Sequence, residues 1–145
     1  MIALKKGHTE KLRIRESWEQ GMIISIKGTV VMGKQLGRTI GFPTANIKAD
    51  GEYEMPQNGV YAAYVYLENG DGPYRSVLNQ GTHPTAPEGP PTIEAHILDF
   101  SGNIYGRAIR AEYVEFLRPE KKFESLDELK KQIAMDEIWA REILR

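Results

Sequence analysis

Five short segments rich in β-branched and aromatic residues most constrain how this chain can fold. In the first, the apolar residues from Ile24 to Met32 alternate with polar ones, which is the two-residue period of a half-buried strand. The other four carry similar strand-forming residues and are separated mostly by short loops. The predicted strands are residues 22–32, 59–67, 74–79, 92–99 and 107–117. A mostly β fold follows.

Turn residues suggest how these strands are joined. The sequences NGDG at 69–72 and SGN at 101–103 favour hairpin-type turns, because Gly and Asn tolerate the positive φ that such turns require. Antiparallel pairing is therefore expected. The longer connections, residues 33–58 and 80–91, are rich in Gly and Pro. Long loops in compact domains tend to carry function, so we expect a site there.

The C-terminal segment changes to a helical period. Ser125 with Glu128 three residues later predicts a capping box, so a helix is expected over about 125–144. Its apolar residues near one face are Leu126, Leu129, Ile133, Ala140 and Leu144. We predict a closed or nearly closed antiparallel barrel over residues 22–145, with this helix covering one opening. We predict that residues 1–21 are an N-terminal extension with a marginal helix.

Length and charge exclude several classes of protein. A chain of 145 residues is the size of one domain. The 19 basic and 20 acidic side chains leave a formal charge of -1, which gives no general attraction to nucleic acid or to an anionic membrane. The absence of cysteine excludes disulfides and a thiolate zinc site, and is compatible with a cytoplasmic location. No segment approaches the roughly 20 apolar residues of a membrane span.

A glycine-rich loop is the first candidate for a phosphate-binding site. In GKQLGRTIGFPTANI, residues 33–47, Gly33, Gly37 and Gly41 recur every four residues, with Lys34 and Arg38 between them. Glycines allow backbone N–H groups to converge on an anion, and the basic side chains add charge. The loop matches neither a Walker A loop nor a dinucleotide-binding fingerprint. The alternative is a flexible connection with a solvated basic edge.

The end of this loop offers ligands for a metal ion. Pro43 favours an extended backbone before it, and in a continued extended chain Thr44 and Asn46 project to the same side. A hydroxyl and an amide carbonyl are hard oxygen donors suited to Mg²⁺. Alternatively, both side chains satisfy backbone groups in a turn.

Two further segments carry candidate catalytic groups. In TIEAHIL the alternation places Glu94 and His96 on one face of a strand, where Glu94 could take a proton from an alcohol during phosphoryl transfer. In FLRPEKKF, Arg118 lies beside two lysines on a predicted loop, from which it could contact phosphate. The alternatives are a solvated strand glutamate and a solvated charge run before a helix.

These segments, taken together and in order, resemble the riboflavin kinase family. The matching pieces are GTVVMGKQLGRTIGFPTANI (28–47), NGVYAAYV (58–65), SVLNQGTHPT (76–85), TIEAHILDFSGNIYG (92–106) and FLRPEKKFESLDELKKQI (116–133). They span nearly all of residues 28–133. The chain departs from the pattern of many relatives at Gln80, where an apolar residue is common, and at Ala86, where Phe is common.

The resemblance implies a six-stranded antiparallel Greek-key β-barrel that uses Mg²⁺-ATP to phosphorylate the ribityl 5′-hydroxyl of riboflavin, giving FMN and ADP. By position, Thr44 and Asn46 match the residues that hold Mg²⁺ and the ATP phosphates, and Gly33 to Gly41 match the flap over the nucleotide. Glu94 matches the catalytic base, and Arg118 matches the arginine of a second flap. Association with an FMN adenylyltransferase is also implied, since bifunctional bacterial enzymes join the two.

Two other functions compete with this one. A catalytically inactive barrel could bind flavin or nucleotide as a sensor or regulatory module. A small barrel could also bind single-stranded nucleic acid, with Tyr61, Tyr64 and Tyr66 as stacking surfaces. The near-neutral charge argues against nucleic acid.

Overall fold

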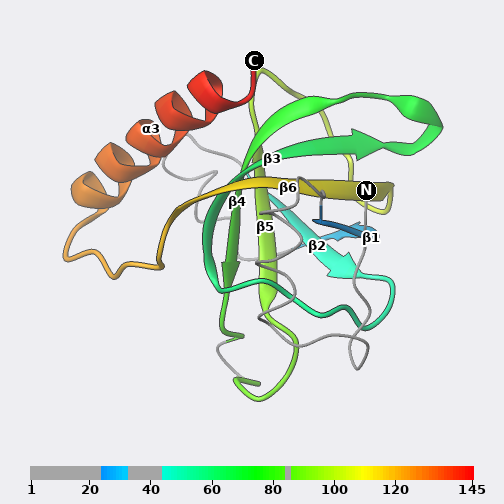
Figure 1. The fold of residues 1–145 in the computed structure, drawn as a ribbon, viewed down its shortest axis with the longest axis horizontal. Helices are drawn as coiled ribbons and strands as arrows, with labels where there is room; N and C mark the ends of the chain where they lie inside the picture. Colours follow the sequence, from blue (N-terminus) through cyan, green and yellow to red (C-terminus); the bar gives the residue numbers. More distant parts are fainter. Residues whose placement is uncertain (1–23, 33–43, 84–85) are drawn as a thin grey trace.

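The strands close into an antiparallel barrel (Figure 1). The computed structural model describes residues 24–32, 44–83 and 86–145. The strands are β1 (Ile24–Val31), β2 (Ala45–Ala49), β3 (Gly59–Leu67), β4 (Tyr74–Gly81), β5 (Thr92–Ile97) and β6 (Ala108–Arg118). Their order around the barrel is β1-β2-β5-β4-β3-β6, and β6 pairs with β1 to complete the ring. This confirms the predicted fold class.

The alternating pattern places one set of side chains inside the barrel. The interior holds aliphatic residues from all six strands together with two aromatic residues, Tyr61 and Tyr113, which have no solvent exposure. Their rings lie 5.0 Å apart in an edge-to-face arrangement, and Phe116 packs edge-on against Tyr61 at 5.3 Å. Because the interior is filled mainly by apolar side chains, the polar residues that alternate with them, such as Asn46, Asn79 and Glu94, point to the outer wall.

Strand β2 lies inside a segment that we predicted to be one long connection, residues 33–58, so the pattern alone missed one of the six strands. The strand has five residues, which is too short for alternation to be distinctive among the surrounding Gly and Pro. Ala45 and Ile47 are buried in the barrel, and Asn46 between them is half-buried. Pairing with β1 and β5 holds this short strand in the ring.

The two predicted hairpin turns differ in outcome. The turn at 69–72 joins β3 and β4, which are paired, and Asn69 adopts a φ of 63° there. The turn at 101–103 does not make a hairpin, because β6 pairs with β3 and β1 and not with β5. Two strands separate β5 from β6 in either direction around the barrel. The turn residues therefore predicted correctly that the chain reverses direction, but they did not identify which strands pair with β6.

Helix α3 (Leu126–Ile143) begins as predicted. The Ser125 hydroxyl accepts a hydrogen bond from the Glu128 backbone N–H at 3.2 Å, and the Glu128 carboxylate accepts one from the Glu124 N–H at 3.2 Å. Ala140 and Leu144 have no solvent exposure, but Leu126, predicted for the same face, is 54% exposed. Among the described residues, none buries the first turn of the helix, and residues 126–128 are all exposed.

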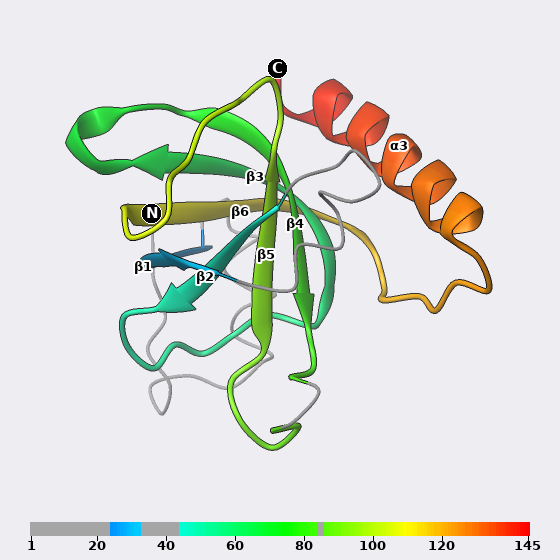
Figure 2. The ribbon, with the colours of Figure 1, turned by 180° about the vertical axis from the view of Figure 1, so that it is seen from behind.

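The helix packs against the outer wall of β3 and β4 instead of across an opening (Figures 1 and 2). Ala140 and Leu144 contact Val60, Ala62 and Val77, which alternate along their strands with residues that point into the barrel. A second, smaller apolar core therefore lies between helix and wall. The prediction of a helical lid over a barrel end was wrong in this respect.

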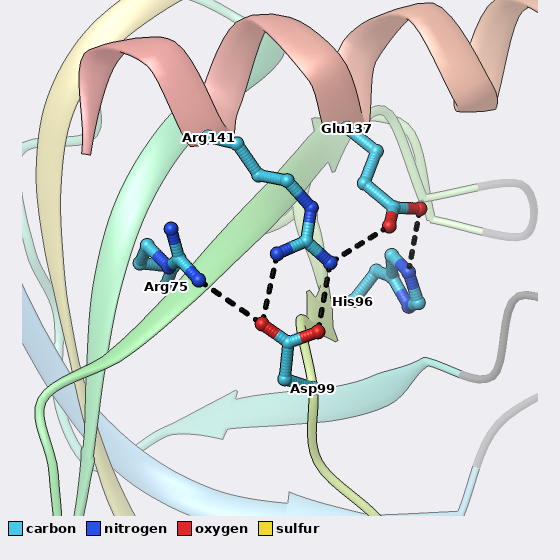
Figure 3. Close-up of polar contacts among 5 residues, drawn as sticks. All are labelled: Arg75, His96, Asp99, Glu137 and Arg141. Carbon is cyan, nitrogen blue, oxygen red and sulfur yellow. Dashed lines mark hydrogen bonds and ion pairs between the residues drawn. The ribbon is translucent and has the colours of Figure 1, made fainter. Parts of the chain in front are cut away.

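An ion-pair network secures the C-terminal half of α3 (Figure 3). Arg141 donates two hydrogen bonds to Asp99, at 2.8 and 2.9 Å, and Arg75 of β4 donates a third at 3.0 Å. The Arg141 guanidinium also donates a hydrogen bond to Glu137 at 3.0 Å, and the Glu137 carboxylate lies 3.6 Å from the imidazole of His96 on β5. The Arg141 hydrogen bonds, more than the Arg75 contact, lower the pKa of Asp99 from 3.8 to about 2. The helix is thus tied to β4 and to the end of β5.

The N-terminal extension, with its predicted marginal helix, lies outside the described residues. Within the part of the chain that the structure describes, no helix combines the length and apolar character needed to cross a membrane.

Candidate active site

A pocket of about 210 Å³ lies on the outer wall of the barrel, beside α3 and the segment that leads into it. Its lining combines polar residues with an apolar wall. The residues are Thr44, Val60, Val77, Asn79, Glu94, His96, Arg118, Glu120, Lys121, Phe123, Leu129, Ile133 and Asp136. Three sequence-predicted site residues, Thr44, Glu94 and Arg118, thus meet in one cavity although they come from distant parts of the chain.

Strand register assembles the polar side of the pocket. Glu94 on β5 is the direct partner of Asn46 on β2 and of Asn79 on β4. Directly opposed residues of an antiparallel pair project to the same face, so two carboxamides flank the carboxylate. The same row continues through Val60 on β3 to Arg118 on β6. Asn79 was not among the predicted site residues, because its place opposite Glu94 depends on the register of β4 and β5, which the sequence pattern does not give.

The end of the glycine-rich loop reaches this row. Thr44 lines the pocket just before β2 begins, and Asn46 stands two residues later, next to Glu94. Because Ala45 between them points into the barrel, both side chains are on the outer side, as the extended spacing predicted. The predicted loop residues Gly33, Lys34, Gly37, Arg38 and Gly41 lie outside the described residues.

These groups suit a magnesium ion that arrives with a nucleotide. Thr44 and Asn46 offer neutral oxygen donors beside one carboxylate, and Mg²⁺ keeps several waters and completes its shell with phosphate oxygens. Among the described residues, no cluster of three or more His, Cys, Asp or Glu side chains could hold an ion alone. The donor set therefore fits a shared metal site, completed by substrate, better than a preformed all-protein cage.

Arg118 occupies a different position from the predicted one. It is the last residue of β6 and not part of a loop. Its Nε and Nη2 donate to the two carboxylate oxygens of Asp136 on α3, each at 2.8 Å, and Nη1 donates to the Pro119 carbonyl at 3.2 Å. Gln132 donates to the same carboxylate at 3.0 Å. Sequence reasoning missed Asp136, because a single acid on a helix is usually solvated.

The segment between β6 and α3 forms the outer rim of the pocket. The Lys121 ammonium and the Arg118 guanidinium lie 5.5 and 5.9 Å from the centre of the Phe123 ring. Glu120 lies beside Gly81 of β4, where a Cβ atom would come within 2.3 Å of its carboxylate. The rim is therefore a mixed-charge surface close to the end of β4, with Arg118 at its inner edge.

His96 also lines the pocket, on the same face of β5 as Glu94. Its Nε2 lies 3.6 Å from a carboxylate oxygen of Glu137, so it connects the pocket wall to α3 (Figure 3). This contact with α3 is consistent with a structural role for His96.

The departure from the family pattern at Gln80 is accommodated by buried hydrogen bonds. The side chain has no solvent exposure; its amide donates to the Pro56 carbonyl at 2.7 Å and to Asn58 at 3.1 Å. Its carbonyl accepts from the Tyr113 hydroxyl at 2.8 Å. Burial raises the pKa of Tyr113, so this hydroxyl remains a donor. Ala86, the other departure, is exposed at the start of a turn.

The tyrosines proposed as stacking surfaces for nucleic acid do not form one. Tyr61 is fully buried in the barrel, while Tyr64 and Tyr66 lie on the outer wall. The Arg110 guanidinium lies 4.0 Å above the Tyr66 ring, which leaves that face covered. The alternative of a single-stranded nucleic acid-binding barrel therefore loses the feature that suggested it.

The arrangement can transfer a charged group to an alcohol. A carboxylate flanked by amides can accept a proton and orient a hydroxyl, the oxygen donors at the start of β2 can hold a cation, and Arg118 brings positive charge to the opposite side. The pocket volume is below the ~300–1,000 Å³ of typical ligand sites. The described residues therefore surround the reacting groups but do not enclose whole substrates.

Comparisons with known proteins point to one family. The family model for riboflavin kinase, or flavokinase, matches residues 20–144. The bifunctional riboflavin kinase/FMN adenylyltransferase of Escherichia coli (strain K12) is 47% identical over 122 residues, which are 84% of this chain and 38% of that protein. The Bacillus subtilis (strain 168) protein of the same name is 43% identical over 138 residues, 92% of this chain and 42% of that protein. The chain thus spans less than half the length of these relatives.

Solved structures share the fold. A crystal structure described as a macrolide-efflux protein from Streptococcus pneumoniae superposes with a TM-score of 0.79 at 31% identity, covering 97% of this chain and 49% of that chain. Riboflavin kinase from Trypanosoma brucei superposes with a TM-score of 0.59 at 26% identity, covering 83% of this chain and 78% of that chain.

Proposed function

This chain belongs to the riboflavin kinase family, and on that premise we propose that it transfers the γ-phosphate of Mg²⁺-ATP to the ribityl 5′-hydroxyl of riboflavin, giving FMN and ADP. The observation that carries the proposal is the placement of Glu94 between two carboxamides, in one pocket with Thr44 and Arg118. These are the groups that an alcohol-directed phosphoryl transfer needs, and they come from separate strands.

Glu94 acts as the general base. Its carboxylate takes the proton of the 5′-hydroxyl as the hydroxyl oxygen forms a bond to the γ-phosphorus, and the bond from that phosphorus to the β,γ-bridging oxygen breaks, so that ADP leaves. Asn46 and Asn79, as direct neighbours, keep the carboxylate facing the pocket and can hydrogen-bond the alcohol. The outer-wall position of Glu94 leaves it accessible to a substrate, since the barrel interior is filled.

Thr44 and Asn46 would hold the metal ion through their side-chain oxygens. An Mg²⁺ ion held by these oxygens would supply positive charge against the charge that develops on the phosphate during transfer. Thr44 immediately precedes β2 and Asn46 lies in it, and β2 is the neighbour of β5, which carries Glu94. The two side chains therefore set the position of the terminal phosphate relative to Glu94. Positioning and charge stabilisation, more than covalent chemistry, are what the protein contributes to such a reaction.

The remaining phosphate contacts are assigned to cationic residues. Arg118 at the end of β6 and Lys121 on the rim approach the pocket from the side opposite β2. Gly33, Lys34, Gly37, Arg38 and Gly41 are assigned to the flap over the nucleotide. Basic side chains would thus contact the ATP phosphates from two sides, with the transferred phosphoryl group between them.

The product FMN is expected to pass to an FMN adenylyltransferase. The relatives named above carry that second activity in the same polypeptide, and this chain corresponds to their riboflavin kinase part. The reaction consumes ATP, so the proposed location is the cytoplasm.

A direct assay tests the function. Purified protein incubated with riboflavin, ATP and Mg²⁺ is expected to yield FMN and ADP in equal amounts, measured by chromatography, and to yield neither when Mg²⁺ is chelated. Quenching of riboflavin fluorescence without release of ADP would instead identify an inactive flavin-binding barrel and reject the proposal.

A further inference from the structure

Asp136 is a charged residue where the helix pattern requires an apolar one. It lies on the face of α3 that also carries Ile133 and Ala140, and it is 1% exposed. Its neighbours in the sequence, Met135 and Glu137, are more exposed, so the burial belongs to this position and not to the whole turn. A buried carboxylate is costly unless ion pairing and hydrogen bonds compensate for the lost water.

The compensation comes from Arg118. The carboxylate accepts two parallel hydrogen bonds from the Nε and Nη2 edge of the guanidinium, each 2.8 Å long, and a third from Gln132 at 3.0 Å. Paired donors and acceptors of this kind fix the plane of a guanidinium as well as its position. A fourth contact, from Nη1 to the Pro119 carbonyl, completes the set.

This geometry leaves part of Arg118 for a ligand. A guanidinium has five N–H groups, and the contacts to Asp136 and Pro119 use three of them. The side chain is 15% exposed, and it lines the pocket together with Glu94 and Thr44. Arg118 is therefore restrained from the helix side while it can still donate hydrogen bonds to an anion in the pocket.

Stability alone explains the pair poorly. Replacing a buried ion pair with packed apolar residues is often neutral or stabilising. A contribution to folding stability therefore does not explain why a buried ion pair is found at this position. The neighbouring Ile133 and Leu129 show that apolar side chains fit this face of the helix beside the pocket. An acid at position 136 gives something an apolar residue cannot, a fixed orientation of Arg118.

We propose that Asp136 is a positioning residue for the proposed phosphoryl transfer: from α3 it holds the Arg118 guanidinium in the plane in which its remaining N–H groups meet the transferred phosphoryl group. The inference rests on the proposed function and extends it to the C-terminal helix. Capping and the Asp99 network fix the helix on the barrel, so α3 serves as the support against which Arg118 is aligned.

The Asp136→Asn variant tests the proposal, because it keeps the shape of the side chain and removes its charge. It leaves Arg118 less restrained and without its counter-charge. We expect kcat for FMN formation to fall about tenfold or more, because misplacing a group by about 1 Å can cost ~100-fold in rate. The KM for Mg²⁺-ATP should not rise, because Arg118 keeps its charge. Asp136→Glu, which restores the charge, should recover part of the loss.

A double-mutant cycle separates positioning from structure. If Asp136 acts through Arg118, Asp136→Asn should lower kcat in the natural background and have little further effect in an Arg118→Ala background. Asp127→Asn, an exposed change on the same helix, is the matched control and should leave kcat unchanged. Urea unfolding of each variant checks that it is folded. If Asp136→Asn does not fold, Asp136→Glu serves as the test variant: it keeps the charge, displaces the carboxylate by one methylene and leaves every N–H group of Arg118 in place, so kcat should still fall, and an unchanged kcat would reject the positioning role.

The outcomes distinguish the two proposals. Natural protein that forms no FMN rejects the proposed function itself. Natural protein that forms FMN, together with a folded Asp136→Asn variant of unchanged kcat, rejects the positioning role alone. Equal losses from Asp136→Asn in the natural and Arg118→Ala backgrounds would also overturn it, since the effect would then not pass through Arg118.

Discussion

Glu94 faces Asn46 directly across the β2–β5 pairing, so the proposed base and a proposed metal ligand are held by the same pair of strands. Neither residue depends on a loop for its position. Their separation is set by backbone hydrogen bonds, and it changes only if the register of the sheet changes.

The first prediction concerns Glu94. Glu94→Gln keeps the size of the side chain but cannot accept the proton of the alcohol, so we expect FMN formation to fall about 100-fold or more. The KM for ATP should change much less, because the carboxylate acts on the acceptor. Glu115→Gln, an exposed change on β6, is the control and should retain full activity. Full activity of the Glu94 variant in the chromatographic assay would exclude Glu94 as the base.

The second prediction concerns the metal ligands. Thr44→Val and Asn46→Leu preserve side-chain volume and remove an oxygen donor, so each should raise the Mg²⁺ concentration for half-maximal rate about tenfold. Higher Mg²⁺ should restore part of the activity. Thr44→Ser retains the hydroxyl and should resemble the natural protein. An unchanged Mg²⁺ dependence in both variants would place the metal elsewhere.

The third prediction concerns the buried amide of Gln80. Gln80→Leu leaves the Tyr113 hydroxyl and the Pro56 carbonyl without this partner inside the barrel, which should lower the free energy of unfolding by about 1–3 kcal/mol. Adding Tyr113→Phe removes one of the two orphaned groups, so the double variant should lose less than the sum of the single losses. Urea unfolding measures all three values. Strict additivity would show that the two side chains are not coupled.

The fourth prediction concerns acid stability. Folding lowers the pKa of Asp99 from 3.8 to about 2, mainly through Arg141, so this contact stabilises the folded protein above about pH 4 and is lost as the pH falls towards 2. Asp99→Asn should therefore reduce the fall in unfolding free energy over that interval. The φ of 57° at this position is tolerated by Asn, so little backbone strain is added. Glu88→Gln, in the exposed loop before β5, is the control. Identical pH profiles for the natural protein and Asp99→Asn would contradict the assignment.

Much of the fold was predictable because its signals are local. Alternation identified the strands that line the barrel, and Ser125 with Glu128 located the start of α3. Strand β2 was missed because five residues between glycine- and proline-rich stretches carry little pattern. The neighbour of β6 was predicted wrongly because strand order depends on long-range packing, which a tight turn at 101–103 does not encode.

The candidate site divides in the same way. The resemblance implied that Glu94, Thr44 and Asn46 act at one site, and the structure brings Glu94 and Thr44 into one pocket on the outer wall, with Asn46 directly opposite Glu94. Asp136 could not be predicted, because its burial depends on how α3 is set against the end of β6. Its signal in the sequence, an acid between Ile133 and Ala140 on one helical face, acquires meaning only once the partner is known.

The row that runs from Asn46 through Glu94, Asn79 and Val60 to Arg118 links chemistry to the completion of folding. Each member comes from a different strand, and a slip of one residue in any of them would turn its side chain inward and bring a buried neighbour out. A partly assembled barrel therefore lacks this site altogether and does not carry a weaker form of it. Catalytic turnover should therefore appear only after the last strand has paired in its native register.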